Sequence, residues 1–162
     1  MNMTNLSKTQ KLTFSACIMA MYVVCLYFTQ SFSFGAYQIR IATSLYALSY
    51  LFPFLVLPFG LANLIGNILS GSLGPLDAIG GFLVGVFTAY LNVRIKKHNL
   101  NPLFLVLTTT FIPGLLVPIW LSWLLNMPYA PLALSLCIGQ VIPAIVGFFL
   151  IKTLQSVINQ AS

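Results

Sequence analysis

The stretch QIRIATSLYALSYLFPFLVLPFGLANLIGNILSGSLGPLD, residues 38–77, decides the topology of the chain. The apolar part of this stretch, residues 44–70, is longer than an ordinary transmembrane helix, and Pro53 and Pro58 interrupt it. A proline inside a helix removes a backbone hydrogen bond and clashes with the preceding turn, so one continuous helix is disfavoured. We therefore predict two shorter helices, at about residues 42–57 and 59–70, that meet at Pro58.

The composition of the whole chain places these helices in a membrane. Of its 162 residues, 59% are hydrophobic and 5% are charged, and the mean hydropathy is +0.99. Soluble domains carry roughly a quarter charged residues, so this chain cannot cover itself with a polar surface. A transmembrane helix needs about 20 apolar residues, so the length allows about six closely connected spans and no separate soluble domain.

The predicted fold is that of an all-α integral membrane protein, a compact bundle of six transmembrane helices. Residues 1–162 are expected to form a single transmembrane domain, with helices at about residues 12–30, 42–57, 59–70, 75–94, 102–125 and 130–152. The first apolar segment is longer than the core of a signal peptide, so we expect it to remain as an uncleaved helix.

The basic residues set the predicted orientation. With two helices between residues 42 and 70, six of the seven basic residues fall on one side of the membrane and only Arg40 falls on the other. Cytoplasmic loops carry an excess of Lys and Arg, so that side, which also holds both termini, is predicted to be cytoplasmic. The basic residues stand beside apolar segments, which is typical of topology determinants, and no nucleic-acid partner is expected.

Arg40 and Asp77 lie at the outer ends of the second and fourth predicted helices, and Asp77 is the only acidic residue of the chain. A charge costs roughly 2.5–3.5 kcal/mol at the centre of a transmembrane helix and less near the interface, so each should lie near water, be paired or line a cavity. Two independent interfacial charges are one interpretation. The other, which we favour, is a pair of contacts at a small-molecule site.

Amides and tryptophans supply further candidates. Asn67 lies one turn after Asn63 in the third predicted helix, and Gln140 falls near the middle of the sixth. Such amides often bind neighbouring helices, whereas Gln140 can equally read the edge of a planar polar ligand. Trp120 and Trp123 fit an aromatic belt at the outer surface, and a stacking wall for a heterocycle is the alternative.

The sequence offers no residues for catalysis. One His and one Asp cannot form a carboxylate dyad, and no metal-ligand cluster, nucleophile with its base, or phosphate loop is present. We therefore expect no enzymatic activity, no cofactor and no metal. Active transport would need an energy source that this chain lacks, because it has no ATP motif and no buried acidic relay. A partner is implied.

Several motifs together resemble a known transporter family. Residues 35–45, GAYQIRIATSL, are similar to the signature Gly-x-x-Gln-x-Arg-x-Ser-Glu-Ala-Leu of the queuosine-precursor transporter (QueT) family. These are substrate-binding S components of energy-coupling factor (ECF) transporters. Further similarity lies in residues 62–71, in residues 76–81 and in residues 138–140, which read Ile-Gly-Gln where the family has Ile-Gly-Glu.

This resemblance implies a membrane-embedded component of an importer, with a small-molecule substrate. Such a component captures a vitamin-like heterocycle, here a queuosine precursor or a related 7-deazaguanine, from outside a prokaryotic cell. The component delivers this heterocycle through an ECF transmembrane subunit driven by two ATPase subunits. The resemblance implies that the component docks on that subunit through its first helix, where Ala16 and Ala20 present small side chains. The implied location is the plasma membrane, crossed several times within the lipid bilayer.

The resemblance and the residue chemistry together name the expected substrate contacts, which are Gln38, Arg40, Thr43, Asn67, Asp77, Trp120 and Gln140. Thr43 and Gln140 stand where the family has Glu, so two anionic groups that could hold an aminomethyl cation are missing. A neutral base, such as the nitrile precursor, fits the remaining amides and the single carboxylate better. The alternatives are an unrelated small transporter or channel for a polar molecule, and a non-catalytic membrane assembly subunit.

Overall fold

The computed structural model describes residues 6–33, 38–70 and 73–160. Its elements are α1 (Lys8–Phe28), α2 (Gln30–Ser33), the 3₁₀ helices η2 (Ile41–Tyr50) and η3 (Pro53–Leu55), α3 (Val56–Ser70), α4 (Pro75–Lys97), α5 (Phe104–Leu125) and α6 (Tyr129–Gln160). These described residues contain no strand. The predicted all-α fold is thus confirmed, while residues 35–37 of the signature and the first two residues of the turn at 71–75 lie outside the described part.

Apolar side chains cover the outside of the bundle as well as its interior. Phe28 is 81% exposed, Trp123 73% and Leu134 64%. Within the part of the chain that the structure describes, five helical segments are long and apolar enough to cross a membrane, namely Lys8–Phe28, Pro53–Ser70, Pro75–Lys97, Phe104–Leu125 and Tyr129–Ile158. A helix that is hydrophobic all round belongs in lipid or in a large core, so the chain is an integral membrane protein built as a helical bundle.

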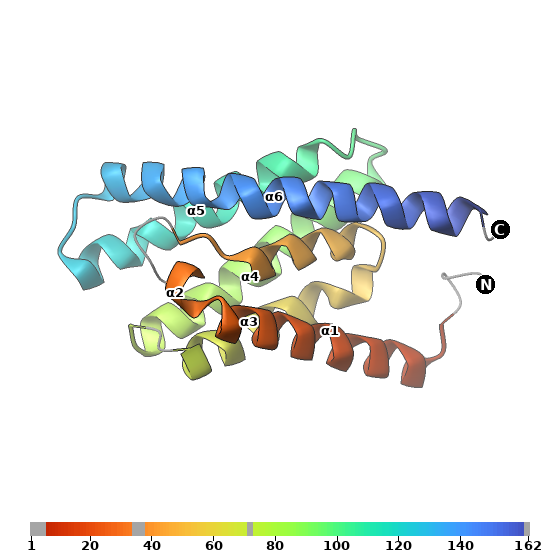
Figure 1. The fold of residues 1–162 in the computed structure, drawn as a ribbon, viewed down its shortest axis with the longest axis horizontal. Coiled ribbons are helices and arrows are strands. Elements are labelled where there is room, and N and C mark those ends of the chain that lie inside the picture. The colour runs from red at the N-terminus through yellow and green to blue at the C-terminus, as the bar shows by residue number, and fades with distance from the viewer. Residues whose placement is uncertain (1–5, 34–37, 71–72, 161–162) are drawn as a thin grey trace.

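The second predicted span, at residues 42–57, is instead a short 3₁₀ helix inside the bundle, η2, followed by the separate turn η3 and the start of α3. Helix η2 packs against α1, α4, α5 and α6, and eight of its ten residues are buried. Figure 1 shows it between α1 and α6. A 3₁₀ helix rises about 2.0 Å per residue against 1.5 Å for an α-helix, so ten residues cover about 20 Å. Because neighbouring helices shield it, η2 needs no lipid-facing surface.

The break between the second and third predicted helices lies at Phe52, and the prediction of a break at Pro58 was wrong. Phe52 has non-helical backbone dihedral angles (φ −124°, ψ 83°), and the proline that follows it disfavours the α conformation at this position. Pro58 instead lies in the first turn of α3. The backbone N–H groups of a first turn have no partner within the helix, so a proline is tolerated there.

Figure 1 shows the start of α1 and the end of α6 at the same end of the bundle, where α4 also ends. Six of the seven basic residues lie in these parts of the helices, namely Lys8, Lys11, Arg94, Lys96, Lys97 and Lys152. Lys11 lies over the ring of Phe54 with 6.0 Å between Nζ and the ring centroid, and Lys96 lies 5.6 Å from the ring centroid of Tyr50. Arg40 precedes η2 at its opposite end. The predicted separation of charge along the bundle therefore agrees with the arrangement of the helices.

Candidate functional site

A small polar cavity lies within the bundle, beside the first turns of η2. Its walls come from the segment before η2 and from η2, α3, α4, α5 and α6, through Gln38, Arg40, Thr43, Tyr46, Asn63, Val84, Pro113, Val117, Leu136 and Gln140. The space open to the centre of a water molecule is about 10 Å³. That is room for about one water, so the cavity is closed around its own side chains.

Arg40 is held by two asparagines of α3. Its Nη1 donates to Oδ1 of Asn67 at 3.2 Å and to Oδ1 of Asn63 at 3.4 Å, and its Nε donates to the backbone carbonyl of Ser33 at 3.4 Å. The Arg40 side chain is only 6% exposed. A guanidinium carries five N–H donors in a planar fork, so the asparagines fix its orientation at the cavity wall.

Asn63 and Asn67 reach this position because α4 carries a glycine where it faces them. A Cβ atom on Gly81 would collide with Nδ2 of Asn67 and lie 3.0 Å from Oδ1 of Asn63. The small residue thus lets two amides lie between α3 and α4. The sequence pattern Gly81-x-x-x-Gly85 indicated close helix packing, and here that packing admits the polar side chains that hold Arg40.

Gln140 joins α6 to the segment around Arg40. Its Nε2 donates to the backbone carbonyl of Gln38 at 3.0 Å, and its Oε1 lies 2.9 Å from the hydroxyl of Thr43. The same hydroxyl lies 2.7 Å from the carbonyl of Arg40, so its one hydrogen has two acceptors within reach. Gln38 adopts a positive φ of 43°. These contacts close the cavity by satisfying polar groups that a ligand could otherwise bind.

Two tyrosines, Tyr22 and Tyr46, extend the polar network to α1. The Tyr46 hydroxyl accepts from Nδ2 of Asn63 at 2.7 Å and lies 3.0 Å from the hydroxyl of Tyr22. The two rings are stacked, with centroids 5.6 Å apart and an interplanar angle of 14°, and neither residue is exposed. A chain of hydrogen bonds therefore connects the cavity to the first helix, running from Arg40 through Asn63 and Tyr46 to Tyr22.

The lone carboxylate, Asp77, does not line the cavity. Its Oδ1 accepts from Nε1 of Trp120 at 2.9 Å, and its Oδ2 accepts from the backbone N–H of Leu73 at 3.3 Å. Its own backbone carbonyl accepts from Nδ2 of Asn67 at 3.4 Å, so Asn67 stands between Arg40 and Asp77. Asp77 is 3% exposed, which argues against the alternative interpretation of an independent charge at the interface.

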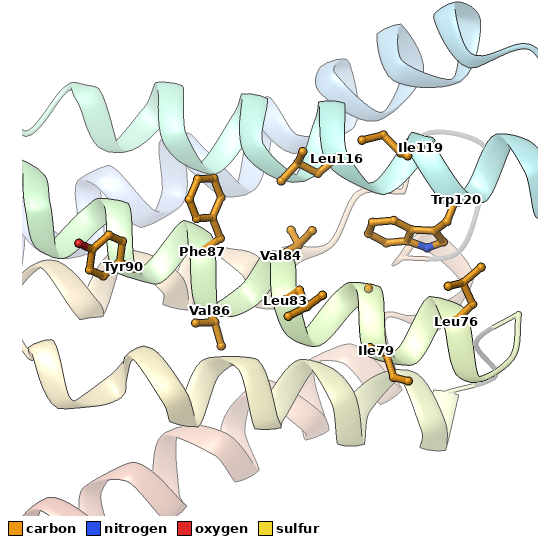
Figure 2. A pocket seen from close by; sticks show the side chains of 11 residues that line it. Leu76, Ile79, Leu83, Val84, Val86, Phe87, Tyr90, Leu116, Ile119 and Trp120 are labelled. Carbon is orange, nitrogen blue, oxygen red and sulfur yellow. The ribbon is translucent and has the colours of Figure 1, made fainter.

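Trp120 lies against α4 and outside the polar cavity. A Cβ atom on Gly80 would come within 2.7 Å of its indole, so only a glycine allows this contact. Trp120 lines an apolar groove between α4 and α5 (Figure 2). The structure therefore brings Gln38, Arg40, Thr43 and Gln140 together at the cavity, with Asn67 behind Arg40, and places Asp77 and Trp120 together beside it.

Tyr46 is the polar cavity residue that the sequence did not single out, and the apolar wall residues Val84, Pro113, Val117 and Leu136 were not predicted either. Arg40, Thr43 and Tyr46 are spaced by three residues, and side chains at that spacing align in a 3₁₀ helix. In an α-helix the same residues would turn progressively away from one another. The spacing therefore indicates that these side chains share one face only once the segment is known to be a 3₁₀ helix.

The two alanines expected to contact a partner lie on the outward face of α1. Ala16 and Ala20 are exposed, whereas Ser15, Ile18 and Tyr22 point into the bundle. The outward face therefore presents small side chains one helical turn apart, and the inward face of the same helix carries the tyrosine that reaches the cavity network.

Comparison with protein families matches residues 12–156 to a model described as QueT transporter. Comparison with curated protein sequences and with solved structures gave no match. The match runs from the first helix to the last, and the fold is the membrane bundle that the sequence predicted. The resemblance inferred from the motifs is thereby confirmed: this chain belongs to the QueT transporter family.

Proposed function

We propose that this transporter-family chain is the membrane-embedded substrate-binding component of an ECF-type importer in the plasma membrane of a prokaryotic cell. Its substrate is a neutral vitamin-like heterocycle related to 7-deazaguanine. It works with an ECF transmembrane subunit and two ATPase subunits, and has no enzymatic activity or cofactor of its own. The observation that carries the proposal is a cavity in the bundle, lined on one side by hydrogen-bonding groups and on the other by apolar side chains.

The charge of the cavity supports a neutral ligand. Asp77 is the only acidic residue of the chain, and it does not line the cavity, whereas Arg40 does. A cationic aminomethyl group would therefore meet a guanidinium and no carboxylate, in surroundings where charges interact more strongly than in water. A nitrile or a ring carbonyl instead offers acceptors to the available N–H and O–H donors.

The site must open to admit such a ligand, because its present volume suits about one water molecule. Gln140 is the side chain whose contacts a ligand can best replace. Its Nε2 donates to the carbonyl of Gln38, and its Oε1 accepts from the hydroxyl of Thr43. A heterocycle with an acceptor atom next to a donor atom can take the place of these two partners of Gln140. Val84, Val117 and Leu136 supply apolar walls for the faces of a planar ring.

A binding measurement on the purified protein tests this proposal. Native mass spectrometry and titration should find the nitrile-bearing 7-deazaguanine bound at least about tenfold more tightly than the aminomethyl compound, which corresponds to about 1.4 kcal/mol. Gln140→Glu, which places an acid where the family signature has one, should shift the preference toward the aminomethyl cation. Tighter binding of the cation by the unaltered protein would refute a neutral substrate. Binding of neither compound would favour a different polar solute.

A further inference from the structure

A second, larger hollow lies on the side of the bundle, between α4 and α5. Figure 2 shows its side chains along the two helices, with Trp120 at one end and Tyr90 at the other. Its volume is about 650 Å³. The lining consists of Leu76, Ile79, Gly80, Leu83, Val84, Val86, Phe87, Tyr90, Leu116, Ile119 and Trp120. Several are strongly exposed, including Leu83 at 59% and Ile119 at 59%.

The shape and chemistry of this groove suit a hydrocarbon chain. From Leu76 to Tyr90 it follows α4 for 14 residues, or about 21 Å at 1.5 Å per residue. Its lining is hydrocarbon apart from the hydroxyl of Tyr90 and the indole N–H of Trp120, and that N–H is bound to Asp77. An occupant of the groove between these ends thus meets apolar surface alone.

The groove ends at positive charge on the same face of α4. Gly80, Leu83, Phe87, Tyr90, Arg94 and Lys97 follow one another at spacings of three or four, which places them on one side of the helix. The Arg94 guanidinium lies over the Tyr90 ring, 5.9 Å from its centroid. Lys96 faces elsewhere, toward Tyr50 at 5.6 Å. The only acidic side chain, Asp77, is at the opposite end of α4.

We propose that the groove between α4 and α5 is a specific site for an anionic phospholipid. One acyl chain lies along Phe87, Leu83 and Gly80, and the phosphate headgroup lies at Arg94 and Lys97. The charge complementarity selects this occupant, because basic side chains next to a membrane-spanning helix attract anionic headgroups while the groove takes the attached chain. The lipid belongs to the leaflet that meets the basic end of the bundle, and its site shares only Val84 with the lining of the polar cavity.

Competition between two lipids tests this site on the whole purified chain. The protein in mild detergent is mixed with equal amounts of phosphatidylglycerol and phosphatidylcholine that have identical acyl chains, and bound lipid is counted by native mass spectrometry. A basic side chain near the membrane surface is worth about fivefold in binding anionic lipid, so two should give a preference of about twenty-five-fold for phosphatidylglycerol. The double variant Arg94→Gln with Lys97→Gln should bring this preference close to one.

Two further variants separate the proposed site from general attraction. Lys96→Gln removes one charge from the opposite face of the same turn and should leave the preference within about twofold of the unaltered protein. Leu83→Trp fills the groove without changing charge and should lower the retention of both lipids. Equal retention of the two lipids by the unaltered chain would overturn the proposal. So would a loss of the phosphatidylglycerol preference in Lys96→Gln as large as that in the Arg94 and Lys97 double variant. Unchanged lipid retention in Leu83→Trp would also overturn it. A lipid-free dimer that Leu83→Trp dissociates would assign the groove to a second copy instead.

Discussion

The hydroxyl of Thr43 lies 2.9 Å from Oε1 of Gln140, which joins the first turn of η2 to α6 across 97 positions of sequence. Both residues stand at positions where the family signature has an acid. Their contact shows that two substitutions which looked independent in the sequence form one neutral hydrogen-bonding unit. This unit lies at the wall of the cavity, where the proposed ligand would meet it.

We expect Gln140→Ala to weaken binding of a neutral heterocycle at least about tenfold. The change removes both a donor and an acceptor from a buried site, and a hydrogen bond left unmade there costs about 1–3 kcal/mol. Titration of purified protein measures the effect. Gln155→Ala makes the same change further along α6, away from the cavity lining, and should leave affinity within about twofold. Similar affinities in the two variants would place the ligand elsewhere.

We expect Tyr46→Phe to lower stability more than Tyr22→Phe. Removing the Tyr46 hydroxyl deprives Nδ2 of Asn63 of its acceptor in a buried position, at a cost of about 1–3 kcal/mol. Removing the Tyr22 hydroxyl leaves the Tyr46 hydroxyl bound to Asn63, so the cost should be about 0.5–1.5 kcal/mol. Thermal unfolding in detergent gives both values, and Tyr27→Phe on the exposed face of α1 is the control. The opposite order would show that Asn63 does not depend on Tyr46.

We expect Gly81→Ala to disturb the site and Gly80→Ala to spare it. The added methyl group at Gly81 collides with the Asn67 amide that holds Arg40, whereas at Gly80 it displaces Trp120. Overpacking costs about 1–3 kcal/mol, so both variants should unfold at lower temperature. Ligand affinity should fall in Gly81→Ala alone. An equal loss of affinity in both variants would mean that Trp120 contributes to the site as much as the asparagines do.

We expect replacement of both Ala16 and Ala20 by Trp to abolish uptake and assembly with the ECF transmembrane subunit. Bulky side chains on this exposed face prevent close helix approach, while ligand affinity in detergent should stay near that of the unaltered protein. Leu134 and Ile138 are also exposed and one turn apart, on α6, so replacing both by Trp is a matched control. Intact uptake in the alanine variant, or equal loss in the control, would reject a docking role for this face.

The sequence by itself determined the class of the protein and much of its layout. Apolar segments of membrane length predict long helices wherever they occur, because lipid leaves the backbone no other partners than its own. The basic residues predicted which helix ends lie together, and the motif residues Gln38, Arg40, Thr43 and Gln140 do meet at one cavity. Those conclusions depend on composition and on local patterns, which a sequence contains in full.

Only the tertiary structure decided the conformation of residues 41–50 and the role of Asp77. Hydropathy does not distinguish an α-helix from a 3₁₀ helix, and the latter forms here within a shell of four helices. That choice sets a period of three residues, which aligns Arg40, Thr43 and Tyr46 at the cavity. Asp77 binds Trp120 from α5, 43 positions away, because packing of α4 on α5 brings the indole N–H to the carboxylate. Such contacts between distant segments are decided by packing, which no local pattern specifies.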